Sequence, residues 1–545
     1  MKVLSLLRFS AAVLLSAALA GCAVAPSAPD RPRLVVFLVV DGLPQRQVLA
    51  YRDQLAPDGL ARFLDRGAWF AEANWGHAYT VTAAGHAAML TGAYPHRTGI
   101  IGNEWRDQLT GKPVYNTEDG SALYIGQSTE PQAGTSPRNL MAQTLGDVLR
   151  RLDPRSKVIG VSGKDRGAIL TAGHSGTAYM YMDQTGRFAS STYYMTAHPA
   201  WVERFNADKP ADRFFKTQWE PLLPPAAYAR SVPDDQPWYG RGGGRLPMTM
   251  GAPADDAPGL AFYSALLASP FVDRLTLDFA RAAISGEALG SDDAPDILAL
   301  SLSGHDYVNH RWSAESRLSQ DHLLQLDRML QAFFRDLDAS VGQDNYLAVL
   351  TADHGFTPAP EYQRAQGLDT GRINFAQVVG RINAGLARRF GEGRWVIGSS
   401  ASSLLLDKGL VAARGLELEA VAQEARALLL AEPGFAAAYT RGELLSGSRA
   451  GDPLFRPLEL SWHPQVSGEI QYTIAPNWVF GATGATHGTP YRSDTHVPVM
   501  LYGPRWVKPG RVDTPVQVVD LAPTLARILR VPVPSSSEGK VLPLP

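Results

Sequence analysis

The chain has 545 residues and a formal net charge of −2. This near-neutral balance, without any block of like charge, argues against a nucleic-acid partner and against a polybasic contact with a membrane surface. Hydrophobic residues make up 45% of the chain, which is enough for a large core. The length suggests two to four domains, or one large α/β domain with insertions.

The first residues are typical of an export signal. Lys2 and Arg8 give a positive start, and the apolar run from Ala11 to Ala20 is too short to span a membrane as a mature helix. We therefore expect residues 1–21 to be a lipoprotein-type signal peptide. The protein would then be exported to the periplasm or cell envelope of a bacterium.

The sequence Leu-Ala-Gly-Cys at residues 19–22 resembles a bacterial lipobox. In this interpretation Cys22 becomes the lipidated N-terminus, and residues 22–33, rich in Pro, Ser and Ala, form a tether. An ordinary cleaved signal peptide with an incidental Cys22 is the alternative. Because Cys22 is the only cysteine, the fold has no internal disulfide.

Four apolar runs predict strands of a parallel sheet that is buried on both faces. They are Leu34–Val40, Lys157–Ser162, Asp296–Leu302 and Tyr346–Thr351. Apolar residues at helical spacing, such as those from Leu323 to Leu337, predict helices between the strands. The alternation predicts a doubly wound, mostly parallel α/β sheet with helices on both faces. Val497–Tyr502 is expected to be a late core strand, and the last helix starts near Val519.

Two stretches break this alternation. Residues 190–290 are rich in Pro, Gly and aromatic residues, and residues 360–480 carry helices of their own. We expect one α/β domain over residues 34–545, in which both stretches are insertions that cap the sheet edge. Arg241 and Arg245 of the first insertion could contact a substrate, but a solvent-exposed glycine loop is the commoner arrangement.

Polar side chains follow each of the four predicted strands. In order along the chain they are Asp41, Lys164-Asp165-Arg166, Asp306 with His310, and Asp353-His354. In open α/β sheets, ligands bind beyond the carboxyl ends of the strands. His487 lies in a loop of small residues, and Asp306 and His310 are spaced to face the same way on a helical turn. Asp and His side chains that converge in this way indicate zinc or a similar ion.

The stretch Thr-Ala-Ala-Gly-His at residues 82–86 is the predicted centre of the chemistry. We expect a short helix from Ala83 to Leu90, with Thr82 at or near its N-terminus, where free N–H groups favour an anion. A hydroxyl there is suited to attack a phosphate or sulfate ester. On this stretch alone, Thr82 as a helix N-cap is the commoner explanation. The metal ligands that converge on the same sheet edge favour a role for Thr82 as the nucleophile over a role as the N-cap.

Seven further histidines are not among the predicted metal ligands, and we expect them to have supporting or structural roles. These are His86, His174, His198, His305, His322, His463 and His496.

Together, these motifs resemble the alkaline phosphatase superfamily. The resemblance is carried by Asp41-Gly42, the Thr82 stretch, Asp306 with His310, Asp353-His354-Gly355 and Thr486-His487-Gly488. Gly102-Asn103 with Lys164-Asp165-Arg166 further resembles the bacterial alkaline phosphatases that use threonine as the nucleophile. The match extends from Asp41 to Thr524 in the order of the family.

The resemblance implies hydrolysis of phosphate monoesters through a phospho-threonine intermediate at a two-zinc site. It implies one zinc ion bound by Asp306, His310 and His487, and another bound by Asp41, Asp353 and His354, with Thr82 as its reactive ligand. It also implies that Asn103, Lys164 and Arg166 contact the phosphoryl oxygens. Small phosphorylated molecules would be the substrates. We expect a monomer whose membrane contact is limited to a lipid anchor on Cys22.

Other functions compete with this one. A phosphodiesterase or nucleotide pyrophosphatase of the same superfamily shares the Thr and Asn, but is expected to lack the Lys-x-Arg pair. A sulfatase needs Cys or Ser followed by x-Pro-x-Arg, which residues 82–86 do not provide. A phosphoglycerate mutase would be cytosolic. A non-catalytic lipoprotein that binds phosphorylated ligands is disfavoured because all expected ligands and the nucleophile are present.

Overall fold

The computed structural model describes residues 31–240 and 243–545 of the chain. The predicted signal peptide, Cys22, residues 22–30 of the predicted tether and Arg241 lie outside the described residues. Within the described residues, no helix is both long and apolar enough to cross a membrane.

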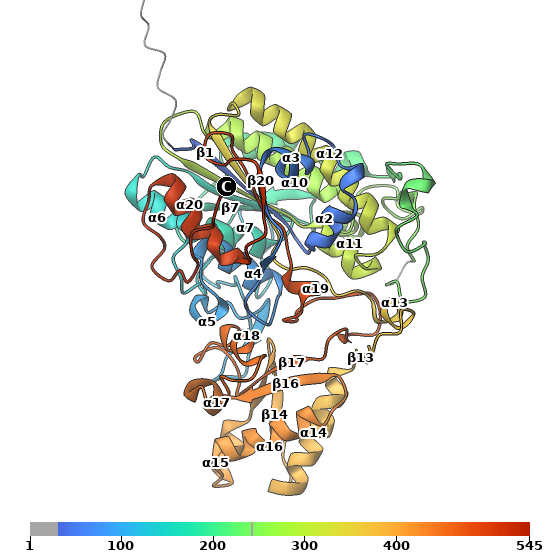
Figure 1. Ribbon diagram of the computed structural model, residues 1–545, viewed down its shortest axis with the longest axis vertical. Helices are drawn as coiled ribbons and strands as arrows, with labels where there is room; N and C mark the ends of the chain where they lie inside the picture. Colours follow the sequence, from blue (N-terminus) through green and yellow to red (C-terminus); the bar gives the residue numbers. More distant parts are fainter. Residues whose placement is uncertain (1–30, 241–242) are drawn as a thin grey trace, which may run out of the picture. The chain divides into compact units, whose positions relative to one another are not determined.

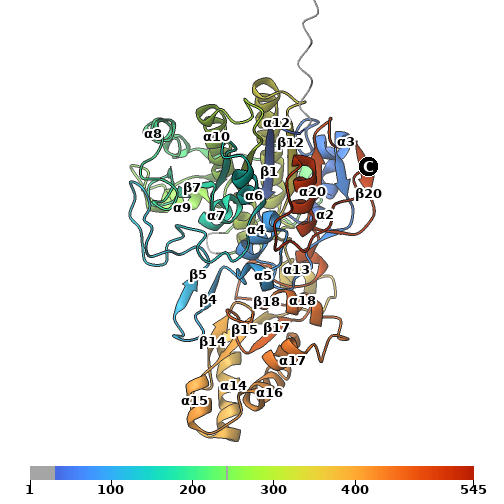
Figure 2. The ribbon, with the colours of Figure 1, turned by 90° about the vertical axis from the view of Figure 1, so that its left-hand side faces the viewer.

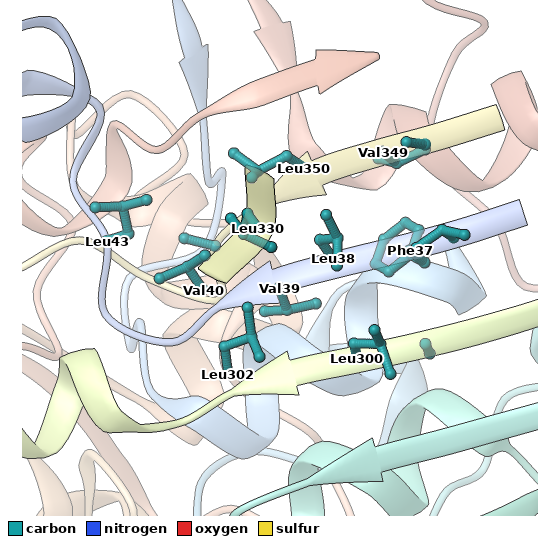
Figure 3. Close-up of a cluster of buried hydrophobic side chains, with 14 of the residues drawn as sticks. Phe37, Leu38, Val39, Val40, Leu43, Leu300, Leu302, Leu330, Val349 and Leu350 are labelled. Atoms are coloured by element: carbon teal, nitrogen blue, oxygen red, sulfur yellow. The ribbon is translucent and has the colours of Figure 1, made fainter. Parts of the chain in front are cut away.

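Strand β1 (Leu34–Val40) lies at the centre of a nine-stranded sheet with the order β20-β2-β19-β12-β1-β11-β6-β7-β8. It pairs in parallel with β11 (Asp296–Leu302) and β12 (Tyr346–Thr351). Every residue of β1 is buried. Its apolar side chains point to both faces of the sheet and pack against apolar neighbours, as in a central parallel strand (Figure 3). The predicted mostly parallel α/β fold is confirmed.

The parallel centre continues through β6 (Val158–Ser162) to β7 (Thr177–Met182). Antiparallel strands complete both sides of the sheet: β8 (Arg187–Ala189) on one side, and β19 (Val499–Tyr502) on the other. β19 also pairs antiparallel with β2 (Ala68–Phe70), which in turn pairs in parallel with β20 (Gly510–Val512).

Helices cover both faces of this sheet (Figure 1). On one face lie α3 (Ala61–Arg66), α10 (Pro270–Glu287) and α12 (Arg317–Ser340), and on the other lie α4 (Thr82–Thr91), α6 (Leu145–Leu152), α7 (Asp165–Ala172) and α20 (Leu521–Leu529). The predicted apolar stripe of α12 is buried from Leu323 to Leu337. Helix α10 closes the first predicted insertion, but it packs against β11 and β6. This part of residues 190–290 therefore belongs to the main layers.

The second predicted insertion builds a sheet of its own (Figure 2). Its strands are β14 (Val396–Ser400), β15 (Ser403–Leu406), β17 (Ile470–Ile474) and β16 (Phe435–Thr440), in that spatial order. Helices α14 (Phe375–Phe390) and α16 (Leu418–Leu430) pack on it around a separate apolar core that includes Leu386, Trp395 and Leu429. Strand β14 contacts β4 (Glu104–Arg106), which links this segment to the main sheet's loops.

The other α-helices of the described residues are short. They are α2 (Gln45–Ala50), α5 (Pro95–Thr98), α8 (Ala200–Ala207), α9 (Leu260–Leu266), α11 (Gly304–Trp312), α13 (Pro360–Arg364), α15 (Lys408–Ala413), α17 (Arg441–Ser446), α18 (Phe455–Leu460) and α19 (Arg492–Thr495).

The contact between β6 and α7 depends on Gly160. A Cβ at Gly160 would lie 2.2 Å from the backbone oxygen of Ala168, so the strand and the helix would have to separate. We expect Gly160→Ala to lower the free energy of unfolding by about 1–3 kcal/mol, the usual cost of overpacking. Urea unfolding followed by circular dichroism measures this.

Gly380 is the matched control, because it lies inside α14 and a Cβ there would meet nothing within 4 Å. Gly380→Ala should stabilise the protein by about 0.5–1 kcal/mol through the lower chain entropy of alanine. A Gly160→Ala protein as stable as wild type would show that the sheet and α7 are not held together this closely.

Candidate active site

Three aspartates meet at the carboxyl edge of the sheet. Strands β1, β11 and β12 run in parallel with Val40 level with Leu302, and Val39 level with Thr351. Asp41 directly follows β1, Asp353 follows β12, and Asp306 lies in the first turn of α11 after β11. All three carboxylates are buried. Level strand ends therefore bring together three acidic groups from distant parts of the chain.

Three histidines point their Nε2 atoms toward these carboxylates. The Nδ1 atom of His310 contacts the Ala485 carbonyl at 3.1 Å, that of His354 contacts the Gly355 carbonyl at 2.9 Å, and that of His487 contacts the Thr80 carbonyl at 2.8 Å. Only a protonated Nδ1 can donate to a carbonyl, so these contacts leave the Nε2 lone pairs free. A carbonyl behind the ring is the usual way that proteins orient a metal-binding histidine.

The side chains form two adjacent groups that could each hold a metal ion. In the first, Asp306 Oδ1 lies 3.4 Å from His310 Nε2 and 3.6 Å from His487 Nε2. The second consists of Asp41, Asp306 and His354, so the two groups share Asp306. In it, His354 Nε2 lies 3.6 Å from Asp41 Oδ1 and 4.0 Å from Asp306 Oδ1. Asp353 was predicted as a ligand of this group; its Oδ2 lies 3.4 Å from His354 Nε2.

The polar atoms of the site fit bound cations. Asp306 Oδ1 and Asp41 Oδ1 are buried, and no described residue donates a hydrogen bond to them. The Nε2 atoms of His310 and His487 lie 3.2 Å apart, and at most one of them can carry a proton toward the other. Burial of carboxylate oxygens without a partner is costly. Nitrogen and oxygen donors in this arrangement suit zinc or a similar ion.

The pKa values of the first group, Asp306, His310 and His487, favour the protonation states that metal binding needs. Burial lowers the pKa of His310 and holds that of His487 well below its usual range. Burial by itself would raise the pKa of Asp306, but Lys164 and the neighbouring histidines hold it well below the usual value. Neutral imidazoles thus face an ionised carboxylate.

Thr82 lies beside this cluster. Helix α4 starts at Thr82 itself, and the Thr82 hydroxyl makes no capping bond; its Oγ1 lies 3.5 Å from His354 Nε2. Gly85 explains the proximity, because a Cβ there would lie 2.4 Å from the Asp353 backbone oxygen. Only glycine lets α4 approach the Asp353 loop this closely.

Asn103 lies beside the N-terminus of α4, the helix that begins at Thr82. Its Oδ1 accepts a hydrogen bond from the Ala83 N–H at 2.9 Å, in the first turn of α4. Asn103 also lines a cavity of about 260 Å³ together with His310 and His487. Its amide oxygen is thus fixed by the helix, and its amide nitrogen remains as a donor.

Lys164 and Arg166 come from the loop and helix after β6. The Lys164 ammonium lies 2.8 Å from Asp41 Oδ2 and 2.6 Å from Asp306 Oδ2. Arg166 lies in the first turn of α7. Its Nη1 donates to the Tyr115 hydroxyl at 3.1 Å, and Tyr115 in turn donates to Asp165 at 2.6 Å. Sequence reasoning missed Tyr115, which follows no predicted strand and matches no motif; in the structure it ends β5 (Pro113–Tyr115).

The remaining predicted residues lie away from the cluster, with one exception. His86 contacts the Thr82 carbonyl at 2.9 Å and Asp353 Oδ2 at 3.3 Å, so it supports both. The others have polar partners elsewhere: His174, His198, His305, His322, His463 and His496. Arg245 pairs with Asp235 and its side chain is 71% exposed, as in a solvated loop.

Known proteins share this sequence and fold. The profile of the family described as type I phosphodiesterase/nucleotide pyrophosphatase matches residues 35–397. The chain is 33% identical to alkaline phosphatase PafA of Elizabethkingia meningoseptica, over 94% of each chain. It is 34% identical to alkaline phosphatase PhoV of Synechococcus elongatus, over 95% of this chain and 94% of PhoV.

A third relative, from Myroides odoratus, is named a calcium-transporting ATPase and is 33% identical over 94% of each chain. The crystal structure of PafA superposes with a TM-score of 0.87, covering 94% of this chain and 98% of PafA. The chain therefore belongs to the type I phosphodiesterase/nucleotide pyrophosphatase family of the alkaline phosphatase superfamily.

Proposed function

We propose that the protein is an alkaline phosphatase that hydrolyses phosphate monoesters through a phospho-threonine intermediate and releases inorganic phosphate. The observation that carries the proposal is the Thr82 hydroxyl, buried 3.5 Å from His354 Nε2 at the junction of two groups of metal ligands. The names of PafA and PhoV support the reaction class.

Each residue of the site has its own role in the proposed reaction. Thr82 Oγ1 gives up its proton and attacks phosphorus, and the bond from phosphorus to the leaving oxygen breaks. The phosphoryl group moves to Thr82, and the leaving oxygen takes up a proton and departs as an alcohol. Water then cleaves the phospho-threonine and restores the hydroxyl. Two zinc ions, one bound by Asp306, His310 and His487 and the other by Asp41, Asp353 and His354, would supply charge stabilisation at the attacking and leaving oxygens.

Three side chains would bind the oxygens of the phosphoryl group that do not react. Asn103 has a free amide donor, and Lys164 and Arg166 bring positive charge from β6 and α7. Arg166 suits a two-point contact with a phosphoryl group, and Lys164 acts as a point charge. A crystallised PafA variant replaces one Thr, one Asn, one Lys and one Arg, the same four residue types.

We also propose that the chain is exported and anchored by a lipid on Cys22, and that it acts as a monomer. The support is the predicted signal peptide and lipobox of residues 1–22. Residues 34–545 would form the catalytic domain, with residues 360–480 as its cap. No nucleic-acid partner is proposed, since the chain's net charge is only −2.

Phosphodiester cleavage is the second candidate, because the matching family profile is described as a phosphodiesterase and nucleotide pyrophosphatase. A monoester presents one more charged oxygen than a diester. Lys164 and Arg166 supply cations for that oxygen, which favours the monoester.

The nucleophile can be tested by removing one hydroxyl. We expect Thr82→Ala to lower kcat for 4-nitrophenyl phosphate by about 10⁴–10⁶, the scale seen when an enzyme loses its nucleophile. Zinc content should stay near that of wild type, because six other side chains hold the ions. Thr91→Ala, at the other end of α4, is the control and should keep its activity. Near wild-type turnover by Thr82→Ala would exclude Thr82 as the nucleophile.

Metal dependence can be tested by chelation. EDTA should remove activity and zinc should restore it, because the zinc ions supply charge stabilisation. Activity should be highest at alkaline pH, because the attacking Thr82 oxygen must be deprotonated. His487→Ala should reduce zinc content measured by mass spectrometry, whereas His463→Ala should not. Full activity of metal-free protein would contradict the proposal, and equal rescue by magnesium would contradict zinc as the natural ion.

The cationic pair can be tested by substrate discrimination. We expect Lys164→Ala with Arg166→Ala to lower kcat/KM for a monoester by roughly 10³ or more, and for a matched diester far less. The control is Arg150→Ala with Arg151→Ala on α6, which removes two cations away from the site. Equal losses on both substrates at unchanged zinc content would favour a general structural role and reopen the diesterase assignment.

A further inference from the structure

A second cavity adjoins the proposed reaction centre. Its volume is about 560 Å³, and it shares four lining residues with the smaller cavity that contains Asn103, His310 and His487. The shared residues are Tyr79, Ile474, Phe480 and Gly488. The two cavities therefore lie side by side, and together they extend from the histidines toward the sheet of residues 360–480. We call the larger cavity the aromatic pocket.

Three aromatic rings from the 360–480 segment line the aromatic pocket. Phe375 is the first residue of α14, Tyr472 lies on β17 and Phe480 lies on β18 (Val479–Phe480). The Phe375 ring stacks against Tyr472 with centroids 5.7 Å apart, and meets Phe480 edge-on at 5.7 Å. Phe375 and Phe480 are only partly buried, so their ring surfaces remain open to a ligand.

Tyr79 forms the wall between the two cavities. A Cβ at Gly102 would lie 3.1 Å from the Tyr79 ring, and a Cβ at Gly488 would lie 3.3 Å from it. Gly488 also has a φ of +115°, which disfavours any other residue. The ring is thus fixed between two backbone segments. Burial raises the pKa of Tyr79 to about 12, so the phenol is neutral at the pH of the reaction.

The aromatic pocket offers no net charge to a ligand. Among its described lining residues the only charged side chain is Arg372. Glu361 neutralises it in a two-point ion pair, at 2.8 and 2.7 Å, and Arg372 also donates to the Gly484 carbonyl at 2.8 Å. The Arg372 Nη1 atom is buried and has no hydrogen-bond partner among the described residues. The remaining polar groups are small hydroxyls and one amide, from Ser399, Ser402, Thr473 and Asn374. A neutral ring suits these walls better than an ionic group.

The direction of the reaction decides which part of the substrate reaches this pocket. In an in-line displacement the leaving group departs on the side opposite the nucleophile. Thr82 lies beside His354, whereas His310 and His487 line the smaller cavity, which shares Tyr79 with the aromatic pocket. A leaving group that departs through the smaller cavity would pass these two histidines and reach Tyr79.

We propose that the aromatic pocket binds the leaving group and selects phosphate monoesters whose leaving alcohol carries a flat, uncharged aromatic ring. This inference rests on the proposed phosphatase function. It assigns Phe375, Tyr472 and Phe480 as specificity-determining residues, with Tyr79 at the entrance. Ring-on-ring contact and burial of the apolar ring supply the preference.

The test compares benzyl phosphate with ethyl phosphate, which both release a primary alcohol. We expect kcat/KM of wild type to be at least about tenfold higher for benzyl phosphate, from one buried ring. Phe480→Ala should lower the ratio of the two values about tenfold. Cyclohexylmethyl phosphate, which is apolar but not flat, should fall between the two substrates.

Matched variants separate ring contact from simple disruption. Phe375→Tyr keeps the ring and should keep the preference, whereas Phe375→Leu should lose part of it. Phe390→Leu, at the far end of α14 beside Trp395, should leave the preference unchanged. Equal turnover of benzyl and ethyl phosphate by wild type would overturn this inference alone. Failure of the zinc-loaded protein to hydrolyse either ester would instead overturn the proposed function.

Discussion

The site depends on one constraint, which is the level ending of three parallel strands. Strands β1, β11 and β12 are each buried on both faces, so the polar residues that follow them can only gather where the strands stop. Asp41, Asp306 and Asp353 are thereby concentrated in a buried volume. Such carboxylates repel one another and lack water, which raises the pKa of Asp41 well above its usual value. Cations at this edge relieve that cost.

Backbone groups then convert a cluster of acids into an ordered site. Carbonyls of Thr80, Gly355 and Ala485 fix the three histidine rings, so the direction of each Nε2 is set by the fold and not by a flexible side chain. Close backbone approach has the same effect on Thr82, because α4 rests on the Asp353 loop through Gly85. Preorganised groups of this kind do not have to move when charge develops during a reaction.

The segment of residues 360–480 contributes a second physical element, since it has its own apolar core. Tyr472 belongs to this core, and Phe375 and Phe480 pack against it. The acidic residues of the candidate site thus follow strands of the large sheet, whereas these three aromatic rings come from the 360–480 segment. Under the proposed function, this separation would let the leaving-group pocket vary without disturbing the proposed metal ligands.

Much of the fold and part of the candidate site could be predicted from the sequence. The central strands could be predicted with nearly their observed bounds, because strands buried on both faces are continuous apolar runs. The Asp and His residues after those strands were enough to predict a metal site. The superfamily was predicted from the resemblance of the whole motif set, including the Thr82 stretch. The nucleophile and ligand roles stay predictions until the variants are measured.

Other features were decided only by the tertiary structure. The sequence could not place Arg166 in α7, assign α10 to the main layers, or reveal Tyr115 as the partner of Arg166. It could not show which carbonyls orient the histidines, since every residue carries the same carbonyl group. The aromatic pocket joins residues from Tyr79 to Gly488. Contacts over such separations depend on how the two sheets fold back on each other, and local patterns carry no information about that.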